Sequence, residues 1–172
     1  MADETRAVTV ERLVTRHHAE VYRYAYRLSG SQADAEDLTQ QAFLVAQEKL
    51  DQLRSEDSAR SWLFTVTRNC FLRTLRGHSA QSAAAMDLDL NQIPEETWDD
   101  PIDHERLQDA LNRLAPEFRV ILVMYYFEDC SYKEIAEKLN LPAGTVMSRL
   151  SRAKGHLRRY LSPHGTLSDG HQ

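Results

Sequence analysis

Three polar side chains near the C-terminal end have the types and spacing needed to hydrogen-bond to the edges of DNA bases. Ser148, Arg149 and Arg152 share one face of a helix that the residue pattern predicts over 143–161. The opposite face is an apolar stripe formed by Val146, Leu150, Ala153 and Leu157. Because an arginine can bond guanine through two parallel hydrogen bonds, this face predicts recognition of DNA in the major groove.

The residues before this helix predict a helix-turn-helix motif. Ser131 and Glu134 form an S-x-x-E capping box at the start of one helix, and Asn-Leu-Pro at 140–142 forms the turn before the next. In such a motif the second helix enters the major groove. The predicted DNA contacts are Thr145, Ser148, Arg149, Arg152 and Lys154, with Lys154 suited to a phosphate. The alternative is that this is only the solvated basic face of a surface helix.

The charges of the chain are unevenly distributed. The 172 residues carry a net charge of −5, yet residues 143–160 contain five basic residues and no acid, and 58–78 contain four and no acid. Between them, residues 86–109 contain nine acids and one arginine. Affinity for DNA grows with the number of phosphates that are neutralised. The pattern therefore favours a protein that binds DNA as part of a larger complex.

The hydrophobic pattern predicts an all-α chain, because apolar residues recur every three or four positions and no segment alternates as a strand does. The predicted N-terminal helices cover residues 8–28, 34–50 and 58–76, with Ser31 or Asp34 as the cap of the second. The predicted organisation is a helical domain over 1–78, a flexible acidic linker over 79–104, a second helical domain over 105–161 and a disordered tail over 162–172.

The helix predicted over 34–50 has an outward face suited to a protein partner. Asp37, Gln41 and Leu44 fall on the side opposite its apolar stripe, and Gln40 flanks them. An exposed leucine among hydrogen-bonding groups fits docking of a partner helix. The alternative is that Glu36 and Asp37 only stabilise the helix N-terminus electrostatically.

The helix predicted over 58–76 has side chains that could bind single-stranded nucleic acid. Arg68, Arg73 and Arg76 could follow the phosphates, and Asn69 could hydrogen-bond to a base edge. Trp62 could stack on a base, but its position in line with Leu63 predicts a core tryptophan instead.

Other kinds of chemistry find little support in the sequence. No arrangement of nucleophile and base predicts an enzyme, and no metal or cofactor is expected. Cys70 and Cys130 have no metal-site or disulfide spacing. The adjacent His17 and His18 point to different helix faces, with His17 toward the core. No signal sequence and no apolar run of about 18 residues is present, so a cytoplasmic protein without membrane insertion is expected.

Several motifs together resemble those of bacterial sigma factors of the extracytoplasmic-function (ECF) type, within the sigma-70 family. Residues 35–43, AEDLTQQAF, and the run RSWL at 60–63 with TRN at 67–69 resemble region 2. The SY-EIA pattern from Ser131, with GTV at 144–146 and SRL at 148–150, resembles region 4. The resemblance covers about residues 10–78 and 105–161, in the order of the family.

The resemblance implies a role for each predicted surface. Asp37, Gln40, Gln41 and Leu44 would bind the β′ clamp helices of core RNA polymerase, with Gln41 where the family commonly has glutamate. Arg68, Asn69, Arg73 and Arg76 would act at the −10 element, near a base-capturing loop at about 51–58. The helix-turn-helix would bind the −35 element, with Met147 where the family often has lysine.

The resemblance also implies partners beyond the promoter DNA. The C-terminal domain would dock on the β-flap tip, and an anti-sigma factor would mask these surfaces. Two alternatives come from other classes of protein. One is a stand-alone helix-turn-helix regulator that binds DNA as a dimer, and the other is an interaction protein whose basic helix binds an acidic partner.

Overall fold

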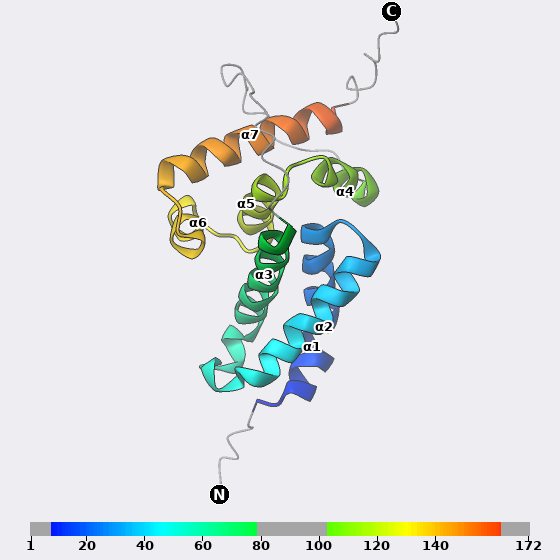
Figure 1. Cartoon of the computed structure of the whole chain (residues 1–172), viewed down its shortest axis with the longest axis vertical. Helices are drawn as coiled ribbons and strands as arrows, with labels where there is room; N and C mark the ends of the chain where they lie inside the picture. Colours follow the sequence, from blue (N-terminus) through cyan, green and yellow to red (C-terminus); the bar gives the residue numbers. More distant parts are fainter. Residues whose placement is uncertain (1–7, 79–102, 163–172) are drawn as a thin grey trace, which may run out of the picture. The chain divides into compact units, whose positions relative to one another are not determined.

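The computed structural model describes residues 8–78 and 103–162, and within these ranges it contains seven α-helices and no β-strand (Figure 1). The chain divides into two compact units, residues 1–82 and 83–172. This confirms the predicted all-α class with two helical domains. The predicted acidic linker and the predicted tail lie almost entirely outside the described residues.

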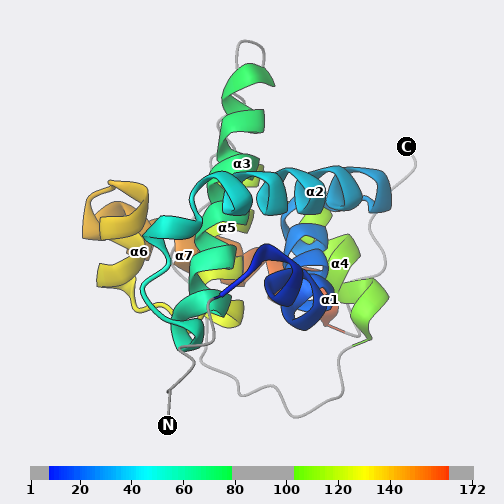
Figure 2. The same ribbon diagram turned by 90° about the horizontal axis from the view of Figure 1, so that it is seen from below.

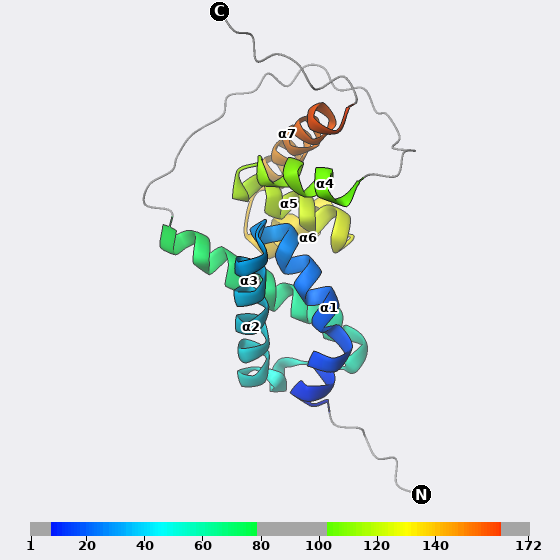
Figure 3. The same ribbon diagram turned by 90° about the vertical axis from the view of Figure 1, so that its right-hand side faces the viewer.

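The N-terminal unit is a bundle of three helices, each packed on the other two. Its elements are α1 (Val10–Ser29), α2 (Gln32–Glu48), the short 3-10 turns η1 (Leu50–Gln52) and η2 (Glu56–Ser58), and α3 (Ala59–His78). The last turns of α3 extend beyond α2, which Figures 2 and 3 show from two directions. The end of α3 is therefore open to a ligand on several sides.

Local hydrogen bonds set the ends of these helices. The Thr9 hydroxyl accepts a hydrogen bond from the Arg12 amide at the start of α1, and Gly30 ends that helix with a φ of 80°. Glycine adopts this left-handed conformation without a steric penalty. Ser31, not Asp34, caps α2, because its hydroxyl accepts from the Asp34 amide at 3.2 Å. The helix therefore begins two residues earlier than predicted.

Apolar stripes from the three helices form the core of this unit. The most deeply buried apolar residues include Leu13, Val21, Ala25, Leu28, Ala35, Ala42, Ala46 and Leu63. The rings of Tyr24 and Phe64 stack with centroids 4.4 Å apart. Trp62 is only half-buried, so its predicted place in the core is met in part. Its neighbour on α3, Leu63, is fully buried.

His17 lies in the core side of α1, as predicted, and is 8% exposed. Neither ring nitrogen has a hydrogen-bond partner in the described part of the chain. Burial lowers the pKa of His17, and nearby Glu20, Arg16, Arg60 and Glu56 modify it less. The imidazole is therefore neutral in the folded unit at pH 7.

The N-terminal unit should lose stability as the pH falls through the ordinary pKa of histidine, about 6.5. Below that value the unfolded chain binds a proton that the folded chain, with its lowered His17 pKa, does not yet bind. The contribution is therefore present above pH 6.5 and declines below it. Urea unfolding followed by Trp62 fluorescence between pH 5.5 and 8 measures this slope. His17→Leu should flatten it, and an unchanged slope in that variant would assign the effect to other groups.

The C-terminal unit contains four helices, three of which contact the last one. They are α4 (His104–Asn112), α5 (Pro116–Phe127), α6 (Tyr132–Leu139) and α7 (Ala143–Leu161). Pro116 occupies the first turn of α5, where its missing N–H costs no hydrogen bond. The core includes Leu111, Val120, Ile121, Met124, Ile135 and the stripe of α7.

Arg119 has a structural role that the sequence did not reveal. Its side chain is buried and donates hydrogen bonds to the carbonyl oxygens of Leu111 at 2.9 Å and Leu114 at 3.0 Å. Leu111 lies in the last turn of α4 and Leu114 two residues beyond the helix, where carbonyls lack the donors that continuation of the helix would provide. Burial lowers the pKa of Arg119, but its guanidinium stays charged. Arg119 thus holds the end of α4 against α5.

Replacement of Arg119 by Met should destabilise the C-terminal unit by about 2–4 kcal/mol, because buried carbonyls lose a charged donor. Hydrogen exchange of the amides in α4 and α5 measures the change. Arg106→Met is the matched control, since Arg106 is an exposed arginine on α4. Equal effects of the two substitutions would contradict the role assigned to Arg119.

Candidate nucleic-acid and protein interfaces

The predicted helix-turn-helix is formed by α6 and α7. The Ser131 hydroxyl accepts from the Glu134 amide at 3.2 Å, and the Glu134 carboxylate accepts from the Ser131 amide at 2.7 Å. This confirms the capping box, and the hydrogen bond from the Ser131 backbone lowers the pKa of Glu134. Asn140 then adopts a left-handed φ of 53°, and the chain turns into α7. The turn fixes the direction in which α7 leaves α6.

The stripe predicted for α7 is buried, which leaves the opposite side of the helix to the solvent. Val146, Leu150, Ala153 and Leu157 are at most 7% exposed. The predicted contact residues Thr145, Ser148, Arg149 and Arg152 are partly exposed. With 3.6 residues per turn, these four lie within about 100° of one another around α7. The structure therefore brings four predicted residues together on one outward surface.

Lys154 lies apart from the other predicted contact residues of α7. It lies five residues after Arg149, which is about 140° further around the helix. Its ammonium lies 4.2 Å from the centroid of the Tyr125 ring, a cation–π contact with α5. Lys154 therefore lies on another face of α7 than Arg149, and its contact with a DNA phosphate stays a prediction.

His156 lies on the same face of α7 as Arg149, and the sequence analysis did not identify it as a candidate contact. It is seven residues after Arg149, two helical turns along the same side of α7. The spacing alone could have identified it. Burial and the neighbouring Arg159 lower its pKa, so the imidazole is neutral at pH 7 and can donate or accept a hydrogen bond.

The outward face predicted on the second helix is present on α2. Asp37, Gln40 and Gln41 are exposed, and Leu44 is 61% exposed, the highest value among the large hydrophobic residues of the described chain. Thr39, between them in sequence, instead turns inward and bonds the Ala35 carbonyl at 2.7 Å. The four predicted residues thus form one polar surface around an exposed leucine.

The arginines predicted on the third helix separate into two environments. Asn69, Arg73 and Arg76 are exposed and recur at four- and three-residue spacing, so they share one face of α3. Arg68 is only 1% exposed, and its guanidinium lies 3.5 Å from the Thr65 hydroxyl. The prediction that Arg68 contacts DNA is therefore wrong, because its position on α3 faces the other helices of the bundle.

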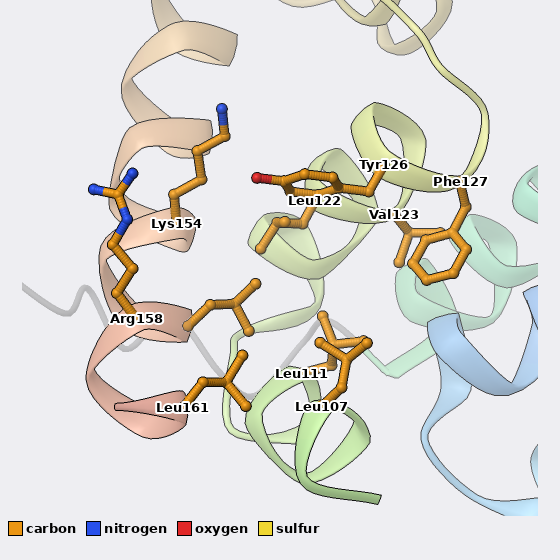
Figure 4. Close-up of a pocket in the computed structure, with 10 residues that line it drawn as sticks. Leu107, Leu111, Leu122, Val123, Tyr126, Phe127, Lys154, Arg158 and Leu161 are labelled. Carbon is orange, nitrogen blue, oxygen red and sulfur yellow. The ribbon is translucent and has the colours of Figure 1, made fainter. Parts of the chain in front are cut away.

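An apolar groove of about 240 Å³ lies between α4, α5 and α7 (Figure 4). Its lining residues are Leu107, Leu111, Leu122, Val123, Tyr126, Phe127, Leu157 and Leu161, with Lys154 and Arg158 from α7. Figure 4 shows both cations on the same wall, across the groove from Tyr126. The groove can take an apolar side chain of a partner that also carries negative charge.

In the described ranges, no cluster of histidine, cysteine, aspartate or glutamate is arranged to hold a metal ion. None of the described helices has the length and hydropathy needed to cross a membrane. Burial raises the pKa of the Cys130 thiol, so this cysteine is protonated at neutral pH.

Comparison with known proteins follows the division into two units. Residues 13–81 match the family model for sigma-70 region 2, and residues 104–157 match that for sigma-70 region 4. SigL of Mycobacterium tuberculosis, an ECF RNA polymerase sigma factor, is 32% identical over 95% of both chains. SigE of Mycolicibacterium smegmatis is 36% identical over 95% of this chain, which spans 66% of the length of SigE.

A solved structure agrees with these relatives. The sigma factor RpoE of Bartonella quintana, crystallised with the anti-sigma factor NepR, superposes with a TM-score of 0.65 at 25% identity, covering 90% of this chain and 97% of that one. The fold of CnrH, solved with the cytosolic domain of CnrY, is also similar, with a TM-score of 0.52 and 22% identity over 86% of this chain and 84% of that one.

A region 2 domain followed by a region 4 helix-turn-helix defines the sigma-70 class of transcription initiation factors. The chain belongs to the extracytoplasmic-function group of RNA polymerase sigma factors within that class. It is a promoter-directing factor, and the comparisons do not favour the stand-alone dimeric regulator.

Proposed function

We propose that this chain acts as a non-catalytic initiation subunit of RNA polymerase, in which α2 binds the core enzyme, α3 acts at the −10 element and α7 reads the −35 element. The observation that carries the proposal is the exposure of polar side chains at the positions that match the family's motifs, one set in each matched region. In this role the protein would work in the cytoplasm, where core polymerase is found.

The exposed face of α2 supports the contact with polymerase. Leu44 can enter an apolar site on the β′ clamp helices, while Asp37 and Gln41 bond polar groups around it. Apolar centres with polar rims are the usual anatomy of protein interfaces. We assign Asp37, Gln40, Gln41 and Leu44 to this contact.

The exposed face at the end of α3 supports a role in opening the −10 element. Arg73 and Arg76 can bind phosphates of the non-template strand, and Asn69 can bond a base edge. Residues 51–58, which lie just before α3, would form the pocket for an extruded base. Capturing that base can repay the few kcal/mol needed to unstack it.

The outward surface of α7 supports recognition of the −35 element. Arg149 and Arg152 can each bond a guanine through two hydrogen bonds, with Thr145 and Ser148 beside them. We add His156 as a base or phosphate contact on the same surface. Lys154 is left out of this surface, because its ammonium lies over Tyr125.

The groove between α4, α5 and α7 is our candidate site for the β-flap tip of the polymerase. Its apolar floor suits an apolar helix, and Lys154 and Arg158 suit acids beside it. An anti-sigma factor is also proposed as a regulator, because the RpoE of similar structure was crystallised with one. The anti-sigma factor would mask the surfaces that we assign to the polymerase and the promoter.

Transcription with purified components tests the proposal. Core RNA polymerase with this chain should initiate from a limited set of promoters in a genomic DNA library, whereas the core alone should not. A correctly folded chain that neither binds core polymerase nor directs initiation would overturn the proposal. Binding of the chain to a palindromic site without polymerase would instead support the dimeric regulator.

A further inference from the structure

Charged side chains on α1 contact one charged side chain of η2, Glu56, and one in the first turn of α3, Arg60. Arg12 donates two hydrogen bonds to the Glu56 carboxylate, at 2.8 and 3.0 Å, and Arg16 donates a third at 3.0 Å. One turn further along α1, Glu20 accepts from Arg60. The matched spacing aligns the loop before α3 with a fixed edge of α1.

We call Arg12, Arg16 and Glu56 the Glu56 cluster. Glu56 is the first residue of η2, within the ten-residue segment 49–58 that joins α2 to α3. Hydrogen bonds within this segment are local: the Ser58 amide and hydroxyl donate to the Ser55 carbonyl, and the Gln52 amide donates to the Lys49 carbonyl. Local bonds shape a loop but do not place it on the bundle. The Glu56 cluster does, because its partners are 40 and 44 residues apart in sequence.

The geometry of the cluster suits orientation rather than stability. The Arg12 Nη2 atom donates to both oxygens of the Glu56 carboxylate and the Arg16 Nη1 atom donates to one of them, so the carboxylate is held from two positions on α1. The side chains of Arg12 and Glu56 are 33% and 29% exposed, so solvent screens their attraction. The neighbouring loop residues Asp51, Gln52, Arg54, Ser55 and Asp57 are exposed. The cluster therefore holds the base of a loop whose other side chains are free to meet a ligand.

We propose that the Glu56 cluster positions the loop at 50–58 for recognition of the extruded −10 base, with Glu56, Arg12 and Arg16 as positioning residues. The inference rests on the proposed function of this loop in the −10 element. A binding site must be held within a fraction of an ångström by groups around it if it is to discriminate between ligands. Loosening the cluster should reduce base discrimination more than it reduces binding to polymerase.

The test uses the full chain with core polymerase and two promoters that differ in one base of the −10 element. Glu56→Gln, Arg12→Ala and Arg12→Lys are compared with Arg23→Ala, which removes an exposed arginine from another side of α1. The initiation ratio between the two promoters should fall roughly tenfold in Glu56→Gln and Arg12→Ala, a size typical of a displaced positioning group. Core affinity should stay within about twofold, and Arg23→Ala should match the parent.

Two additional measurements separate the possible outcomes. Hydrogen exchange of residues 50–58 should accelerate in Glu56→Gln while the α1 amides keep their protection. If Glu56→Gln does not fold, Arg12→Lys decides the question, since it keeps the positive charge but replaces the planar guanidinium by an ammonium on a different stem. A looser loop with an unchanged promoter ratio would overturn the positioning role.

A variant of the loop separates two claims: that the Glu56 cluster positions the loop, and that the loop recognises the extruded −10 base. Gln52→Ala with Arg54→Ala changes the exposed face of the loop and leaves the Glu56 cluster intact. If this variant keeps the parent's promoter ratio, the loop does not read the base and the proposed function of the loop fails. If it loses discrimination while the cluster variants do not, only the positioning role fails.

Discussion

Asp37→Arg is expected to weaken binding of the chain to core RNA polymerase by at least about 100-fold, or about 2.7 kcal/mol. Asp37 is exposed on α2, next to the strongly exposed Leu44, so the substitution should leave the bundle folded. A reversed charge in a complementary interface costs several kcal/mol, because an attraction becomes a repulsion. Fluorescence anisotropy of labelled chain titrated with core polymerase measures the affinity.

Glu36→Arg is the matched control for this experiment. Glu36 is the neighbouring exposed acid, and it stabilises the N-terminal part of α2 to a similar degree through the helix dipole. It points about 100° away from Asp37 around the helix and bonds Gln32 at 3.0 Å. If both substitutions weaken core binding equally, the acids act only on the helix, and the α2 surface is not the interface.

Local rules were sufficient for the parts of this protein that the sequence predicted well. The capping box at Ser131, the turn at Asn140 and the stripe from Val146 to Leu157 each depend on residues within one or two helical turns. Such short-range patterns fix both where a helix begins and which side of it is buried. The outward face of α7 could therefore be predicted, and with it most of the surface that we propose contacts DNA.

The misplaced residues are those whose surroundings come from another helix. Arg68 looks like its neighbours Arg73 and Arg76 in sequence, but it alone faces the bundle. Lys154 meets Tyr125 of α5, and Arg119 bonds carbonyls at the end of α4. Long basic side chains can turn either toward solvent or along an apolar surface. The five-residue offset of Lys154 from Arg149 places it on another face of α7, but composition and spacing do not identify Tyr125 as the ring that it contacts.

The Glu56 cluster could not be predicted for the same reason. It joins α1 to a segment 40 residues away, and nothing in the spacing of Arg12 and Arg16 identifies Glu56 as their partner. The segment was assigned to the −10 element only through its place between the second and third helices. The ion pairs supply a physical reason for its orientation, which family resemblance alone did not provide.

Arg149→Ala should reduce promoter-specific initiation by about 10- to 100-fold, the loss expected when one bidentate arginine–guanine contact of about 1–3 kcal/mol is removed. Discrimination should relax at one base pair of the −35 element, because the contact reads a base edge. Affinity for core polymerase should not change, since Arg149 lies outside both proposed core contacts, the exposed face of α2 and the groove between α4, α5 and α7. Initiation rates from a library randomised at the −35 element measure both effects.

Lys154→Ala is the control for the loss of −35 discrimination expected in Arg149→Ala. It removes the same single positive charge from α7, but from the face that contacts Tyr125 and borders the apolar groove. It should therefore leave −35 discrimination unchanged, even if contact with a partner in the groove weakens. Relaxed discrimination in Lys154→Ala with none in Arg149→Ala would reverse the assignment of the two faces of α7. That result would require α7 to present its other face to DNA. A rotation of α7 to do so would expose the buried stripe of Val146, Leu150 and Ala153 to water, which is unfavourable.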